Sequence, residues 1–192
     1  MKREFELKAV LTGEEAEFRA RLSRAGWRLS FEGTMSDRRL DTPDRVLEDR
    51  DVVLRLRSMR ARSGETRTSL CWKGPASEED GYKVRAEVET TVGDAVVAAE
   101  IMGRLSYTET TLALDREIAV FAKGGVWARI ERYPAMDTLI ELEGDPADVE
   151  ACIEELGLPR EAWKPWPLGV FIQQYEERTG GAARLCEEDH RG

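Results

Sequence analysis

The sequence predicts an α+β fold: a closed antiparallel β-barrel, or tunnel, of about eight strands with the helices packed outside. Alternation of apolar and charged residues with a period of two, which is typical of strands, dominates the chain. About eight or more such segments stand against three or four helical ones, and their short connections favour antiparallel pairing. With 192 residues, the chain is long enough to bury a core.

The first half of the chain alternates in this way almost throughout. Residues 3–11 are predicted as a strand, and residues 12–26 as a helix that begins with a capping box of Thr12 and Glu15 and ends at Gly26. Five further strands are expected before residue 93, over residues 27–33, 35–42, 51–60, 66–75 and 80–92.

The second half adds the remaining helices. Asp94 and the Asp145-Pro146 pair are typical helix starts, and they predict helices over residues 94–105 and 146–157. A last helix is expected over residues 169–179, after an irregular segment. Three more strands are predicted over residues 110–121, 125–133 and 137–145. We expect one domain over residues 1–178 and a flexible C-terminal tail over residues 179–192.

Composition excludes several classes of function. A net charge of -9 disfavours nucleic-acid binding, which relies on a positive field. The lone histidine, His190, lies in the polar tail, so a histidine-based catalytic triad is not expected. Three widely spaced cysteines suggest neither a disulfide framework nor a zinc motif, and they favour a cytoplasmic location. No apolar run is long enough for a membrane helix.

The charged faces of the predicted strands are unusual. Each face tends to carry one sign of charge, and the two Glu-x-Glu pairs place like charges about 6.5–7 Å apart. The residues that share a face are Glu4, Glu6 and Lys8; Arg55 and Arg57; Ser69, Cys71 and Lys73; Lys83, Arg85, Glu87 and Glu89; Trp127, Arg129 and Glu131; and Glu141 and Glu143.

Two arrangements accommodate these faces. They can form the solvated side of an ordinary antiparallel sheet. Alternatively, a closed barrel can turn them inward, around a water-filled lumen that binds ions. In the second arrangement, carboxylates without histidine suit Mg²⁺ or Mn²⁺, and clustered arginines and lysines suit a ligand with several phosphates.

Five segments in order along residues 1–178 favour the second arrangement. They are EFELK (4–8), DRRLDTPDRVLEDRDVVLRLR (37–57), CWKGP (71–75), KVRAEVE (83–89) and IERYPAMDTLIELEG (130–144). Together they resemble the motifs of CYTH-domain proteins, the triphosphate tunnel metalloenzymes. That family includes inorganic triphosphatases, thiamine triphosphatases and class IV adenylyl cyclases.

The resemblance implies specific roles in a tunnel. It implies a metal site formed by Glu4, Glu6, Glu141 and Glu143. It implies that Glu6 and Lys8 take part in catalysis. It implies a triphosphate site formed by Lys8, Arg55, Arg57, Lys73, Arg85, Arg116 and Arg129. It also suggests a homodimer.

The chain departs from the family pattern inside this predicted tunnel. Leu114 stands where the family usually has the lysine of a Lys-x-Arg pair, of which Arg116 remains, and Arg129 is expected to compensate. Arg39 stands where the family often has an aromatic residue, and Glu131 where it usually has aspartate.

The predicted function is a divalent-metal-dependent hydrolase of tripolyphosphate or a small organic triphosphate. The first alternative is an adenylyl cyclase that makes cyclic AMP from ATP in the same tunnel. The second is a non-catalytic binding module for polyphosphate or a nucleotide. The sequence does not distinguish among them.

Overall fold

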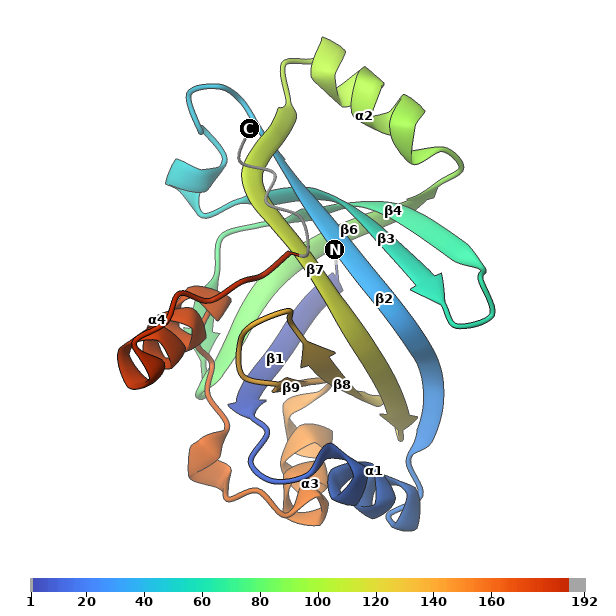
Figure 1. Ribbon diagram of the computed structural model, residues 1–192, viewed down its shortest axis with the longest axis vertical. Helices are drawn as coiled ribbons and strands as arrows, with labels where there is room; N and C mark the ends of the chain where they lie inside the picture. Colours follow the sequence, from blue (N-terminus) through green and yellow to red (C-terminus); the bar gives the residue numbers. More distant parts are fainter. Residues whose placement is uncertain (1, 187–192) are drawn as a thin grey trace.

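Eight strands pair edge to edge into a closed antiparallel barrel in the computed structural model of the protein (Figure 1). The strands follow the order β1-β9-β8-β7-β2-β3-β4-β6, and the barrel closes because β6 also pairs with β1. A short strand, β5, adds to the other edge of β6. The structure describes residues 2–186, except for the side chains of Lys2, Thr111 and Leu112.

The strands and helices have the following bounds. The strands are β1 (Lys2–Val10), β2 (Arg28–Asp41), β3 (Val53–Ala61), β4 (Thr66–Lys73), β5 (Ser77–Glu79), β6 (Tyr82–Val92), β7 (Thr108–Lys123), β8 (Val126–Arg132) and β9 (Leu139–Glu143). The α-helices are α1 (Glu15–Arg24), α2 (Ala95–Arg104), α3 (Pro146–Leu156) and α4 (Leu168–Thr179), and two 3-10 turns are η1 (Glu48–Arg50) and η2 (Arg160–Ala162).

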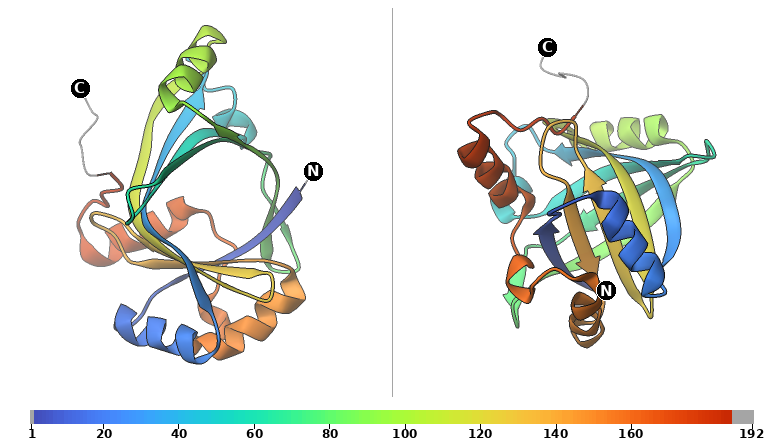
Figure 2. Two further views of the ribbon diagram at one scale, coloured as in Figure 1. Left: turned by 90° about the vertical axis from the view of Figure 1, so that its right-hand side faces the viewer. Right: turned by 60° about the horizontal axis from the view of Figure 1, so that its bottom comes forward.

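The helices lie outside the barrel, as predicted. Figure 2 shows α1 and α3 together against one side of the ring of strands, and α2 at the opposite side. None of the described helices is both long and apolar enough to cross a membrane.

The main core lies between the barrel wall and the pair α1 and α3. Phe18 and Leu22 of α1 and Val149 of α3 are buried there against the outward-facing residues of β1 and β9, including Leu7 and Leu142. The apolar half of each alternating strand is therefore used to attach these helices, which leaves the charged half to face the lumen.

A smaller core anchors α4. Phe171 packs with Leu139 and Tyr133, and Trp166 lies against Phe171 with ring centroids 5.8 Å apart. The start of α4 thereby reaches one section of the barrel lumen, whose lining includes Leu168.

The two strands predicted over residues 27–33 and 35–42 are one continuous strand, β2, so that prediction was wrong. Gly33, at the end of the first predicted strand, allows β2 and β3 to approach closely. A Cβ atom at this position would lie 2.0 Å from the carbonyl oxygen of Arg60. The glycine is thus required by strand packing and not by a turn.

The predicted capping box of Thr12 and Glu15 was also wrong. Helix α1 begins at Glu15 with Glu14 as its N-cap, and no side chain caps it. The Glu15 carboxylate accepts hydrogen bonds from Arg19 and Arg132 instead, at 2.6 and 2.5 Å. The other two predicted helix starts are confirmed, because Asp94 accepts from the backbone N–H groups of Val96 and Val97, and Asp145 accepts from that of Ala147.

The domain boundary at residue 178 stays a prediction. After α4 the chain returns to the barrel, where Arg184 and Ala135 exchange two backbone hydrogen bonds of 2.8 and 3.0 Å. The rest of the predicted tail, residues 187–192 with His190, lies outside the described residues.

We predict that Leu22→Ala lowers the free energy of unfolding by about 2–5 kcal/mol, because it leaves a cavity between α1 and the barrel. Ile101→Ala on α2 is the matched control. Ile101 is 55% exposed, so its truncation should change stability by less than about 0.5 kcal/mol. Urea unfolding of both variants measures the difference, and equal losses would contradict this assignment of the core.

Candidate active site in the barrel lumen

Register places the charged residues of neighbouring strands opposite one another. On β1, Glu4 lies opposite Arg85 of β6, and Glu6 lies opposite Glu143 of β9. Glu4, Glu6 and Lys8 on the inner face of β1 are all buried, and Glu4 and Glu6 are only 5% and 6% exposed. The charged faces therefore point into the lumen, and the arrangement as a solvated sheet face is excluded.

The lumen contains two neighbouring cavities. The wider one has a volume of about 870 Å³ and the narrower one about 120 Å³, and both are lined by Arg57, Arg129 and Glu141. Every predicted site residue lines one or both of them. The wide cavity has Glu4, Arg57, Arg129, Glu141 and Glu143, and the narrow cavity has Glu6, Lys8, Arg55, Arg57, Lys73, Arg85, Arg116, Arg129 and Glu141.

A single carboxylate, Asp37, organises three of the arginines. Arg57 donates to it through Nε and Nη2 at 2.7 and 2.9 Å, Arg116 through Nη2 at 2.9 Å, and Arg55 through Nη1 at 3.3 Å. Burial alone would raise the pKa of Asp37. The charges of Arg55, Arg57 and Arg116 outweigh burial and hold this pKa well below its usual range. Asp37 is therefore a permanent anion that fixes the arginine side chains.

Glu131 forms a second such centre on β8. It accepts hydrogen bonds from Arg129 at 2.9 Å, from Arg116 at 3.3 Å and from the hydroxyl of Tyr133 at 3.0 Å. Although burial opposes it, the charges of Arg116 and Arg129 lower the pKa of Glu131. The glutamate that replaces the usual aspartate here thus holds two predicted phosphate ligands in place.

The predicted metal ligands are paired with lysines and arginines. Glu4 pairs with Lys73, and Glu6 with Lys83. Glu141 pairs with both Lys8 and Arg129. Without these partners, so many buried carboxylates would repel one another strongly. Three of these cations, Lys8, Lys73 and Arg129, are predicted phosphate ligands, so a bound ligand has to exchange with their ion pairs.

Charge is distributed unevenly between the two cavities. The wide cavity has more acidic than basic side chains, namely Glu4, Glu87, Glu89, Glu141 and Glu143 against Arg57, Arg67 and Arg129. The narrow cavity has a large basic excess, namely Lys8, Arg39, Arg55, Arg57, Lys73, Lys83, Arg85, Arg116 and Arg129 against Glu6, Asp37, Glu131 and Glu141. The narrow cavity suits a polyanion, and the wide one suits cations.

The chemistry of the glutamate set fits a hard divalent cation. All four candidate ligands are carboxylates on two neighbouring strands, and Glu6 and Glu143 are direct partners in the β1–β9 register. Oxygen ligands of this kind suit Mg²⁺ and Mn²⁺. The four stay candidate ligands, because each of Glu4, Glu6 and Glu141 is engaged by a basic side chain here.

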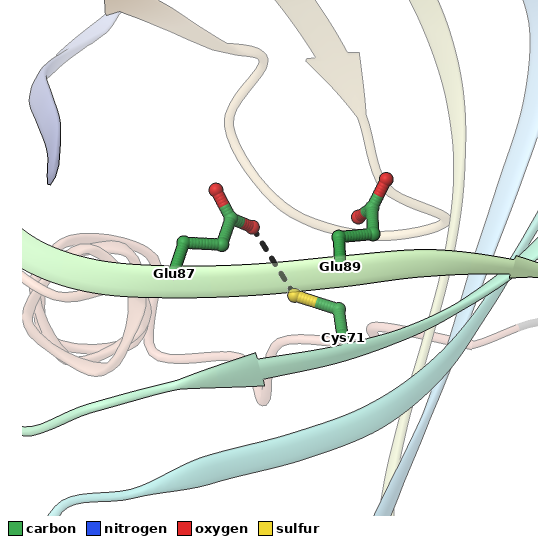
Figure 3. A group of neighbouring side chains, drawn as sticks. All are labelled: Cys71, Glu87 and Glu89. Atoms are coloured by element: carbon green, nitrogen blue, oxygen red, sulfur yellow. Dashed lines mark hydrogen bonds between the residues drawn. The ribbon is translucent and has the colours of Figure 1, made fainter. Parts of the chain in front are cut away.

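Another group brings three ligand atoms together among the described residues. The ligand atoms of Cys71, Glu87 and Glu89 lie within 4.8 Å of one another in the lumen, and Cys71 Sγ donates to Glu87 at 3.1 Å (Figure 3). Burial raises the pKa of the Cys71 thiol to about 11. Hard cations such as Mg²⁺ and Mn²⁺ prefer oxygen to sulfur ligands, so the two carboxylates are the ligands of this group that suit them.

Arg85 and Asp41 both form hydrogen bonds with backbone groups of nearby turns. Arg85 donates to the carbonyl oxygens of Asp51 and Gly74 at 2.8 and 2.6 Å, and to the Asp51 carboxylate at 2.6 Å. Asp41 accepts hydrogen bonds from the backbone N–H groups of residues 42, 47 and 48, so it stabilises the turn that follows β2.

Sequence reasoning missed Asp37, Lys83 and Tyr133 as site residues. A signal for Asp37 was present, because it alternates with Arg39 and Asp41 along β2. The pattern gave no indication that this one aspartate meets three arginines, since that depends on how β3 and β7 flank β2.

Comparison with known proteins bears on this site. The sequence matches the CYTH domain family over residues 2–132. No curated protein sequence matches the chain.

Solved structures share the fold at low sequence identity. A Pyrococcus horikoshii protein is 21% identical with a TM-score of 0.72, and the match covers 89% of this chain and 99% of that one. A candidate adenylate cyclase from Vibrio parahaemolyticus is 16% identical with a TM-score of 0.74, over 90% and 98% of the two chains. An adenylyl cyclase candidate from Hippeastrum, reported to have a dominant triphosphatase activity, is 15% identical with a TM-score of 0.62, over 91% and 96%.

We predict that Asp37→Asn flattens the acid limb of the stability profile. A carboxylate whose pKa is lowered by folding stabilises the protein above its unfolded pKa of about 4, and this contribution is lost as pH falls toward the folded value. The thermal midpoint of the native protein should therefore fall between pH 5 and pH 3, and that of the variant should fall less.

The variant should also lose about 3 kcal/mol at pH 7, because three arginines lose their shared anion. Asp44→Asn, at an exposed position, is the matched control and should leave both the midpoint and its slope unchanged. Parallel pH profiles for the native protein and Asp37→Asn would contradict the role of Asp37.

Proposed function

Because the chain belongs to the CYTH domain family, we propose that it is a divalent-metal-dependent hydrolase of tripolyphosphate or a small organic triphosphate. The observation that carries the proposal is the division of one lumen into a basic narrow cavity and an acidic wide cavity. A triphosphate needs cationic side chains along its phosphates, and its hydrolysis needs charge neutralisation at the bond that breaks. The two cavities offer these side by side.

The basic cavity would bind the phosphate chain. Arg55, Arg57 and Arg116 are held by Asp37 with donors left over. Arg55 Nε and Arg116 Nη1 are buried atoms without a hydrogen-bond partner among the described residues. Buried N–H donors without partners cost free energy, which phosphate oxygens can recover. Lys8, Lys73, Arg85 and Arg129 would complete the lining.

The glutamates would hold Mg²⁺ or Mn²⁺ and orient water. We assign the cation to Glu4, Glu6, Glu141 and Glu143; when bound, it would supply Lewis-acid charge neutralisation to the phosphate oxygens. Glu6 would orient the attacking water. Lys8, within 3.3 Å of Glu6, would stabilise negative charge that develops on the leaving group. Because Lys8, Lys73 and Lys83 now bind the glutamates, we expect them to turn toward phosphate when the ligand enters.

The wide cavity leaves room for an organic group. Its wall includes five apolar side chains, Phe31, Met59, Val88, Val120 and Trp127. Its volume is in the range usual for small-molecule sites. This wall favours an organic triphosphate over tripolyphosphate, and it is also the observation that favours the alternative function, an adenylyl cyclase. The second alternative, a binding module without turnover, is supported by Leu114 in place of a lysine.

The partners proposed for the protein follow from the same site. We propose a small-molecule triphosphate as its ligand, no nucleic acid, and a cytoplasmic location. A homodimer stays a proposal on family grounds.

We predict phosphate release from tripolyphosphate, ATP or thiamine triphosphate in the presence of Mg²⁺ or Mn²⁺. Glu4→Gln and Arg57→Ala should each reduce the rate at least about a hundredfold, since each removes a charge required in the transition state. Glu100→Gln and Arg104→Ala change an exposed ion pair on α2 and are the matched controls. Product analysis separates the functions, because a cyclase would form cyclic AMP and pyrophosphate, and a binding module would form neither.

We predict that EDTA abolishes activity and that Mn²⁺ restores it. Titration of Mn²⁺ followed by electron paramagnetic resonance should show weaker binding in Glu6→Gln and in Glu143→Gln, because each loses a carboxylate of the proposed site. Cys71→Ser should bind Mn²⁺ as the native protein does. If Mn²⁺ bound equally well to all three variants, the ligand assignment would be wrong.

A further inference from the structure

Arg39 is a lumen residue that makes no hydrogen bond or ion pair with any of the described residues. It is the next inward-facing residue of β2 after Asp37, and it lines the narrow cavity. Among residues 2–186 no side chain or backbone group makes a hydrogen bond or ion pair with it, whereas Arg55 and Arg57 both bind Asp37. A partly buried guanidinium without an anion is costly unless a ligand supplies one.

The surroundings of Arg39 increase this cost. Burial lowers the pKa of Arg39, and the positive charges of Arg55 and Arg85 lower it further, with only partial compensation from Asp37 and Glu48. Arg39 therefore strengthens the positive field of the narrow cavity at the expense of stability, which is typical of binding residues.

Position 114, where the family usually has a lysine, lies beside Arg39. Leu114 of β7 pairs with Asp37 in the strand register, so it is a diagonal neighbour of Arg39 on the inner face. Both residues line the narrow cavity. Leu114 brings no charge to this wall, and Arg39 brings one from the neighbouring strand.

Arg39 also marks one end of the narrow cavity. It and Val53 are shared with a separate pocket of about 350 Å³ formed by the turn after β2 and the start of β3. The apolar wall of the wide cavity lies beyond the other end, where Arg57, Arg129 and Glu141 line both cavities. A phosphate chain in the narrow cavity would therefore have one end at Arg39 and the other facing the wide cavity.

We propose that Arg39 binds the free terminal phosphoryl group of the polyphosphate chain and replaces the lysine that is absent at position 114. This inference rests on the proposed function and adds a direction to it. A terminal phosphoryl group carries close to two negative charges at pH 7, more than an internal one, so it gains most from an additional cation. Any organic group would then lie in the wide cavity.

The test is calorimetric titration of tripolyphosphate into native protein, Arg39→Gln, and the double variant Arg39→Gln/Leu114→Lys, with EDTA and again with Mn²⁺. Loss of a charge-assisted contact predicts roughly tenfold to hundredfold weaker binding by Arg39→Gln. The double variant should recover most of this loss, because lysine at position 114 returns a cation to the same wall. Arg60→Gln, an exposed position on β3, should bind as the native protein does.

Thermal unfolding without ligand separates a binding role from a structural one. Because Arg39 has no partner, Arg39→Gln should unfold at the same temperature as the native protein or higher. Native affinity in Arg39→Gln, or no recovery in the double variant, would overturn the inference and leave the proposed function intact. If the native protein bound no tripolyphosphate in either condition, the proposed function and the inference would both fail.

Discussion

The structure depends on one electrostatic constraint: a closed barrel that turns its charged strand faces inward must neutralise those charges inside. Water alone cannot do so where residues such as Asp37 and Glu131 are about 1–2% exposed, since an uncompensated buried charge costs several kcal/mol. Asp37 forms ion pairs with three arginines and Glu131 with two, and Arg116 pairs with both carboxylates. These two carboxylates connect β2, β3, β7 and β8 through side chains as well as through backbone hydrogen bonds.

Some charged side chains of the lumen are fully paired with opposite charges and others are not. The incompletely paired ones indicate where ligands would bind. Among the described residues, Arg55 and Arg116 beside Asp37 keep buried donors without partners, and Arg39 makes no hydrogen bond or ion pair. On the opposite wall, Glu4 and Glu6 of β1 and Glu141 of β9 pair with lysines and with Arg129. A polyanion and a divalent cation, entering together, would satisfy both walls. The charges of the lumen are thus only partly neutralised by one another among the described residues, which is a compromise expected of binding sites.

Much of this could be predicted from alternation alone, because inward and outward faces follow from the two-residue period of each strand. That is why all the predicted glutamates, lysines and arginines line the lumen. The pairings could not be predicted, since they depend on strand register and on the order in which the barrel closes. Hence Asp37 was missed, Arg85 has its partners in the turn at Asp51, and Lys83 binds Glu6. The close approach of β3 to Gly33 could not be predicted either, because a sequence does not show where another backbone comes within contact distance.

The central claim is that the acidic and basic sections of the lumen bind a divalent cation and a phosphate chain next to each other. A crystal of the protein with tripolyphosphate and Mn²⁺, measured at the manganese absorption edge, tests it most directly. We expect an anomalous peak between the carboxylates of β1 and β9, and phosphate density that runs from there toward Arg39. Manganese or tripolyphosphate bound only on the outer surface, with the ion pairs of Lys8, Lys73 and Lys83 unchanged, would contradict the account.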